Sequence, residues 1–149
     1  MLTIHVLPRR LKEFLLTHPL YKSPKFHPHT QCFGIIHHMT LEDINAKVNG
    51  KVEVAADGAA ATCVYCGDLL SDIMGHAGED CALVTIQNHL NTIAVCTLVG
   101  CPVIVLCHNR PVPPDMAEAA KREGVAIIVT GLSQYAAALA LSELPPADK

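Results

Sequence analysis

The chain has 149 residues and a net charge of −3, and its length suffices to bury the core of one domain. Half of its residues are apolar and none is Trp, so that core must be built from aliphatic side chains. The net negative charge does not favour binding to nucleic acid, which is itself negatively charged. The longest apolar run, over residues 94–106, is too short and too interrupted by Gly100 and Pro102 for a membrane span.

Residues 1–38 differ in composition from the rest. They carry five Lys and Arg residues and one Glu, which gives a net charge of +4. Residues 39–149 carry six Lys and Arg residues and thirteen Asp and Glu residues, which gives a net charge of −7. Four prolines interrupt their helical pattern. We expect a mis-assigned upstream extension or a poorly ordered basic arm. An organelle-targeting peptide is the weaker alternative, because Ser is scarce.

A folded domain is predicted over residues 39–144, followed by a disordered tail over 145–149. Thr40 is a good helix N-cap, with acidic Asp43 three residues on. Apolar periodicity and turn residues place the later elements. In chain order we predict a helix over 41–48, strands over 52–55 and 62–65, a helix over 68–77, a strand over 81–86, a helix over 89–99, a strand over 102–107, a helix over 113–123, a strand over 125–130 and a helix over 133–144.

Four successive strand–helix steps require right-handed crossovers. They predict a three-layer α/β fold with a largely parallel sheet and helices on both faces. The helix over 89–99 is apolar nearly all round, so it should be covered on more than one side. A homodimer would provide that cover.

Polar or glycine residues follow each strand from residue 61 onward. Because the carboxyl ends of parallel strands lie at one edge, where such sheets bind ligands, we expect these clusters to converge on a crevice. The clusters are Cys66-Gly67-Asp68, Gln87-Asn88-His89, His108-Asn109-Arg110 and Thr130-Gly131-Leu132-Ser133.

Two of the clusters have a capping interpretation beside the functional one. Asp68 and Asp72 could hold a cation or act as an acid/base pair, but acidic residues favour a helix start in any case, and His76 could pair with Asp72. Gln87, Asn88 and His89 could contact an anion at a helix start or simply cap that helix. His89 could act as a general base, although spacing identifies no partner for it.

Arg110 and the last cluster suit an anion. Arg110 directly follows a buried strand and could bind a phosphate or carboxylate, or form an ion pair with Asp68 or Asp115. Gly131 supplies a tight turn and Ser133 an N-cap, where one anion contact could form beside Thr130. No phosphate-loop motif occurs in the sequence.

The seven cysteines have no disulfide-framework spacing, which indicates a reduced, cytoplasmic protein. Cys63 and Cys66 form one C-x-x-C motif without a second pair at zinc-finger spacing. They could form a redox pair or a weak metal site, but strand alternation places them on opposite faces. We interpret them, with the other cysteines, as small apolar core residues.

Several blocks of the sequence together resemble the DRTGG domain family over about residues 39–144. The resemblance is strongest to stand-alone members encoded near iron-only hydrogenase and NADH-linked electron-transfer subunits in anaerobic bacteria. It rests on Gly67-Asp68-Leu69-Leu70-Ser71-Asp72-Ile73-Met74, Thr85-Ile86-Gln87-Asn88-His89-Leu90-Asn91, Asn109-Arg110 and Thr130-Gly131-Leu132-Ser133.

The resemblance implies a fold similar to the N-terminal domain of HPr kinase and to the regulatory insert of CBS-domain pyrophosphatases, which pairs with its copy. Kinase activity is not implied, because it belongs to the other domain of HPr kinase. The chain lacks the Asp-Arg and Thr-Gly-Gly steps that name the family, and Leu90 stands where a Pro usually follows the His.

The sequence favours a non-catalytic, dimeric regulatory or ligand-binding module, linked through the resemblance to hydrogenase or redox metabolism and to an electron-transfer partner. No cofactor is predicted, and a nucleotide or another phosphate-containing ligand would suit the strand ends. One alternative is an enzyme for a phosphorylated or carboxylated metabolite that uses His89, Asp68 and Arg110. The other is a thiol or metal sensor built on Cys63 and Cys66.

Overall fold

The computed structural model describes residues 38–147. Of the segment 1–38, which we interpret as an extension, only His38 lies within the described residues. The elements, in chain order, are β1 (Met39–Thr40), α2 (Leu41–Lys47), β2 (Lys51–Val54), β3 (Ala60–Ala61), β4 (Cys63–Cys66), α3 (Leu70–His76), β5 (Cys81–Thr85), α4 (Leu90–Val99), β6 (Val103–Leu106), α5 (Pro114–Glu123), β7 (Ala126–Val129) and α6 (Gln134–Ala140).

The main sheet has the strand order β2-β7-β6-β5-β4. β4, β5, β6 and β7 are parallel, whereas β2 pairs antiparallel with β7 at one edge. The predicted α/β fold with a largely parallel sheet is thereby confirmed. The antiparallel direction of β2 was not predicted, because β2 pairs only with β7, which lies far from it in the sequence. β1 and β3 form a separate two-stranded sheet.

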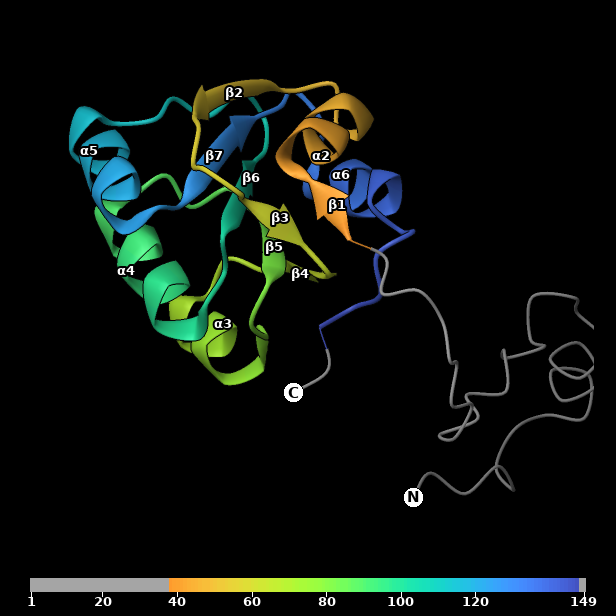
Figure 1. Ribbon diagram of the computed structural model, residues 1–149, viewed down its shortest axis with the longest axis horizontal. Helices are drawn as coiled ribbons and strands as arrows, with labels where there is room; N and C mark the ends of the chain where they lie inside the picture. The colour runs from red at the N-terminus through yellow and green to blue at the C-terminus, as the bar shows by residue number, and fades with distance from the viewer. Residues whose placement is uncertain (1–37, 148–149) are drawn as a thin grey trace, which may run out of the picture. The chain divides into compact units, whose positions relative to one another are not determined.

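Helices cover both faces of the sheet (Figure 1). The core layer under α3, α4 and α5 includes Ile73, Ile93 and Met116, packed with Leu83 and Ile104 of the strands. The opposite core layer lies under α2 and α6 and includes Ile44 and Ala137, packed with Val84 and Val105. β6 is buried along its whole length, as expected for a parallel strand covered on both sides.

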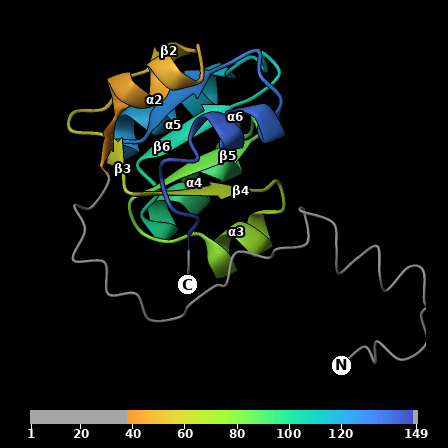
Figure 2. The same ribbon diagram turned by 90° about the vertical axis from the view of Figure 1, so that its right-hand side faces the viewer.

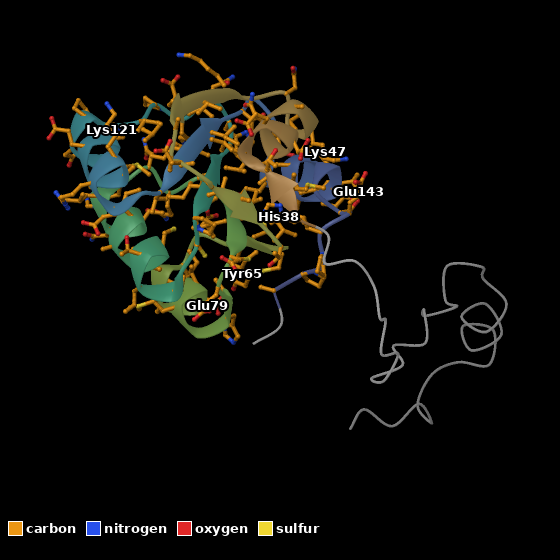
Figure 3. The ribbon with its side chains drawn as sticks, viewed as in Figure 1. His38, Lys47, Tyr65, Glu79, Lys121 and Glu143 are labelled. Carbon is orange, nitrogen blue, oxygen red and sulfur yellow. The ribbon has the colours of Figure 1, made fainter. Side chains whose placement is uncertain are left out.

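The two ends of the described chain are held in different ways. The predicted N-cap at Thr40 is present, since its Oγ1 accepts a hydrogen bond from Asp43 N at 3.2 Å. Lys47 of α2 forms a 2.7 Å ion pair with Glu143, and Figure 3 shows the two side chains close together. Among residues 38–147, no helix is long and apolar enough to cross a membrane.

The start of the predicted disordered tail is paired with the sheet. Val64 N donates to Pro145 O at 3.0 Å, and Ala147 N donates to Val64 O at 2.9 Å. Figure 2 shows this segment passing beside β4. Backbone pairing thus holds residues 145–147, because β4 is an edge strand with free backbone groups, while residues 148–149 lie outside the described range.

Gly50 is required where α2 turns into β2. A Cβ at this position would lie 2.5 Å from Ile128 Cγ2 and 3.0 Å from Val129 O. We expect Gly50→Ala to lower the free energy of unfolding by about 1–3 kcal/mol, because buried core and backbone would have to shift. Denaturant unfolding measures this change.

Gly75→Ala is the matched control, since a Cβ there meets nothing within 4 Å and the residue lies inside α3. It should be neutral or stabilise the protein by up to about 1 kcal/mol through helix propensity. Equal destabilisation by the two changes would contradict the close approach at Gly50.

Candidate functional site

The carboxylate of Asp68 joins three elements at the carboxyl ends of the strands. Its Oδ1 accepts hydrogen bonds from Thr85 Oγ1 and Ile86 N, both at 2.9 Å. Its Oδ2 accepts from Gln134 Nε2 at 3.0 Å, across 66 residues of sequence. Asp68 follows β4, Thr85 ends β5 and Gln134 begins α6. One side chain therefore fixes two strand ends relative to the helix that covers them.

These contacts keep Asp68 ionised. Burial alone would raise the pKa of the Asp68 carboxyl, but hydrogen bonds from Ile86, Thr85 and Gln134, with the positive charge of Arg110, outweigh burial and lower the pKa. A carboxylate with a lowered pKa that already accepts three hydrogen bonds is a poor general acid. Its role is to hold the edge together.

The loop after β6 carries two consecutive residues in the left-handed backbone conformation. His108 has φ 59° and Asn109 has φ 50°. Their backbone N–H groups donate to Leu132 O at 3.0 Å and to Thr130 O at 2.8 Å, which ties this loop to the loop after β7. Non-glycine residues seldom adopt this conformation, and clusters of them are found at binding and catalytic sites.

Gly131 lies against the side chain of Asn109. A Cβ at Gly131 would stand 3.1 Å from Asn109 Nδ2, so the two loops pack closely. Thr130 is buried between them: its hydroxyl donates to Val48 O at 2.7 Å and accepts from Leu132 N at 3.2 Å. Thr130 therefore links the loop after β7 to the end of α2, and its buried hydroxyl is not accessible to a ligand.

Arg110 is exposed at this edge. Among residues 38–147 no carboxylate lies within 4.0 Å of its guanidinium, so neither of the predicted ion pairs, with Asp68 or with Asp115, forms. Its charge nevertheless contributes to lowering the pKa of Asp68. Arg110 thus lies near Asp68 while its own hydrogen-bond donors remain available to an anion.

The cluster after β5 is occupied mainly by local contacts. Asn88 Nδ2 donates to Pro111 O at 2.9 Å, which links this loop to the segment after Arg110. His89 Nδ1 accepts from Asn91 N at 3.2 Å and so caps α4. Gln87 N donates to Thr85 Oγ1 at 3.1 Å. The capping interpretation accounts for His89, while Asn88 positions the neighbouring loop.

The remaining predicted residues also have structural partners. Ser133 caps α6, because its Oγ accepts from Ala136 N at 3.2 Å. Gly67 N donates to Val84 O at 3.1 Å at the end of β4. Asp72 accepts from the hydroxyl of Tyr65, which raises the pKa of Tyr65 to about 12, and its Oδ1 lies 3.1 Å from His76 Nδ1. Asp72 therefore interacts along α3 and with β4, and not with Asp68.

Cys63 and Cys66 occupy opposite ends of β4. Desolvation and the nearby charge of Asp68 raise the pKa of the Cys66 thiol, which disfavours a reactive thiolate. Within residues 38–147 no group of three or more metal-ligating side chains is arranged to hold a metal ion.

We use the term strand-end rim for residues 87–89, 108–111 and 131–133. Asp68 binds the residues next to the first and last of these segments, and backbone hydrogen bonds from His108 and Asn109 tie the middle segment to the loop after β7. Sequence analysis missed two of the supporting residues, Thr85 and Gln134. Thr85 was detectable as the one polar residue at the end of an otherwise apolar strand; Gln134 gave no signal. Two hollows lie away from the rim: one of about 390 Å³ between α4 and α5, and one of about 370 Å³ beside α2.

No family model matches the sequence, and neither does any curated protein. Among solved structures, the chain is similar to the CBS and DRTGG domains of the regulatory region of Clostridium perfringens pyrophosphatase, crystallised with its activator, diadenosine tetraphosphate. The identity is 12%, the TM-score is 0.59, and the match covers 72% of this chain and 48% of that chain. The match therefore spans about half of that crystallised regulatory region, and the likeness supports a DRTGG-like fold.

Asp68→Asn tests the role of the carboxylate. We expect the free energy of unfolding at neutral pH to fall by about 1–3 kcal/mol, because charge-assisted hydrogen bonds are replaced by weaker ones. Since the folded-state pKa of Asp68 is lowered, its stabilisation is present above the ordinary carboxyl pKa of about 4 and is lost as pH falls through the folded value.

Denaturant unfolding across the acid range should therefore show the difference between wild type and Asp68→Asn shrinking below about pH 4. Asp57→Asn, at an exposed turn, is the control and should match wild type throughout. A difference that stays constant as the pH falls would contradict an ionised Asp68 at the centre of the rim.

Proposed function

We propose that this chain is a regulatory module that binds a phosphate-containing ligand of the nucleotide class at the strand-end rim. The observation that carries the proposal is the guanidinium of Arg110, which has no ion-pair partner among residues 38–147. It adjoins two residues in the left-handed conformation at the carboxyl edge of a parallel sheet. This edge is where ligands bind in open α/β folds. The regulatory, nucleotide-bound context of the similar pyrophosphatase region supports the same class of ligand.

Binding is favoured over catalysis by the contacts of the two candidate acid/base groups. Asp68 already accepts three hydrogen bonds, and His89 Nδ1 caps α4. A catalytic base must have a free acceptor within reach of the proton it removes. The enzyme alternative therefore gains no support from these residues, whereas Arg110 needs no such partner to bind an anion.

Self-association through α4 is the second part of the proposal. Leu90 and Leu98 are 39% and 73% exposed, and Ala94 lies midway between them on the same helical face. These positions are symmetric about Ala94. A two-fold axis there would place Leu98 of each copy against Leu90 of the other, with small Ala94 allowing close approach. The hollow between α4 and α5, lined by Leu90 and Ala94, would be covered as well.

A link to iron-only hydrogenase or NADH-linked electron transfer is supported only by the sequence blocks at 67–74, 85–91, 109–110 and 130–133. We retain it as the proposed setting, in which the partner would be an electron-transfer subunit. The ligand-binding and dimer proposals do not depend on it.

Ligand binding is tested by thermal shift with diadenosine tetraphosphate, AMP and inorganic phosphate, and with uncharged adenosine for comparison. A ligand at about one hundred times its Kd stabilises the native state by about 2.7 kcal/mol. We expect a phosphate-containing probe to raise the Tm of wild type and Arg110→Gln to abolish that shift. Arg122→Gln, which changes an exposed arginine paired with Glu123, should retain it.

The two parts of this test separate the ligand from its site. An unchanged shift in Arg110→Gln would refute the rim as the site. If none of the phosphate-containing probes raises the Tm, the nucleotide class itself is wrong.

Self-association is tested by sedimentation equilibrium on Leu98→Glu. We expect wild type to be a dimer and the variant to have a dissociation constant at least about tenfold higher, because two charges would be buried in an apolar interface. Leu139→Glu, which changes an exposed leucine of α6 on the other face, is the control and should remain dimeric. A monomeric wild type, or dissociation by Leu139→Glu alone, would contradict the α4 interface.

A further inference from the structure

Four cysteines gather away from the strand-end rim, at the opposite end of the parallel strands; we call them the thiol cluster. Cys63 begins β4 and Cys81 begins β5, while Cys96 lies in α4 and Cys101 directly precedes β6. All four pack in the core layer under α3, α4 and α5. The sulfur of Cys81 is in hydrogen-bond contact with those of Cys63 and Cys101, and Cys96 is in contact with Cys101.

Cys63 and Cys81 are direct partners in the parallel register of β4 and β5. Neighbouring strands lie about 4.7–4.9 Å apart, which is within the range of about 4.4–6.8 Å that a disulfide needs between its Cα atoms. Both side chains enter the same core layer, so they project from the same face of the sheet. The register therefore brings the two cysteines within the Cα range of a disulfide.

The two thiols differ in access to solvent. Cys63 is half-buried, and its Sγ lies 3.7 Å from Glu79 O in the turn before β5. Cys81 is completely buried. The hydrogen bond to Cys101, together with burial, raises the pKa of Cys81, so Cys81 is not the first thiol to ionise. An oxidant from solvent reaches Cys63 first, and Cys81 is placed to react second.

We propose that Cys63 and Cys81 form a reversible oxidation site for hydrogen peroxide or an organic hydroperoxide. The Cys63 thiolate attacks a peroxide oxygen and the O–O bond breaks. Hydroxide departs from hydrogen peroxide, or an alkoxide from an organic hydroperoxide, and Cys63 becomes a sulfenic acid. The Cys81 sulfur then attacks the Cys63 sulfur, the S–O bond breaks, and water leaves with the Cys81 proton. For hydrogen peroxide, two thiols and one peroxide give one disulfide and two waters.

This pairing replaces the one suggested by the C-x-x-C motif. Cys66 lies at the other end of β4, beside the rim, and is exposed. A Cys63–Cys81 disulfide would instead fasten the edge strand β4 to β5 at their amino ends. The hydrogen bonds of Asp68, at the carboxyl end of the same strand, need not change. The oxidation site is therefore independent of the proposed ligand.

The test is a peptide map of the full chain after treatment with hydrogen peroxide and alkylation under denaturing conditions. We expect a cross-linked peptide pair containing Cys63 and Cys81, two hydrogens lighter than the reduced pair, that dithiothreitol converts back to two free thiols. Cys63→Ser should abolish the cross-link. Cys66→Ser, the matched change on the same strand, should leave it intact.

Wild-type protein provides the decisive reading, so the test does not depend on the folding of a variant. Absence of a cross-link, a cross-link that omits Cys81, or Cys63 recovered only as sulfinic or sulfonic acid would overturn the proposal. Loss of the cross-link in Cys66→Ser would overturn it as well.

Discussion

One carboxylate organises the functional edge of this molecule. The carboxyl end of β5 and the first turn of α6 present backbone and side-chain donors that need acceptors. Asp68 supplies both carboxylate oxygens to three of those donors, on Thr85, Ile86 and Gln134. Because it is ionised, these bonds are stronger than neutral ones, and they offset the cost of its partial burial. Without this carboxylate, the ends of β4 and β5 would lose the hydrogen bonds that join them to the start of α6.

The sheet separates two kinds of chemistry. Its carboxyl edge is polar and has an available guanidinium at Arg110, beside backbone held in an uncommon conformation at His108 and Asn109. Its amino edge holds thiols in an apolar layer, with Cys63 and Cys81 in register on neighbouring strands. β4 reaches both ends. A ligand at one end would contact the loops after β5, β6 and β7, whereas an oxidant at the other end would act on β4 and β5.

Sequence reasoning succeeded where periodicity carries the information and failed where contacts join distant residues. The alternating strands and helices after Met39 were predictable, because buried parallel strands such as β6 are continuously apolar and Thr40 carries a capping signal. The antiparallel β2 and the pairing of Pro145 with Val64 were not, since each depends on which edge is free. Asp68 was identified, but as a ligand-binding group, because nothing in the sequence reveals that Gln134 binds it. The register that sets Cys63 beside Cys81 gave no sequence signal, because a single sequence does not show which strands are neighbours.

The central claim is that the strand-end rim, organised by Asp68, is where a phosphate-containing ligand binds. Backbone amide chemical shifts, recorded during titration with a nucleotide, test it most directly. The account predicts that the largest shift changes fall together on Ile86, on residues 108–110 and on Gly131, which lie far apart in sequence. Changes concentrated instead on residues lining the hollow between α4 and α5 would contradict it.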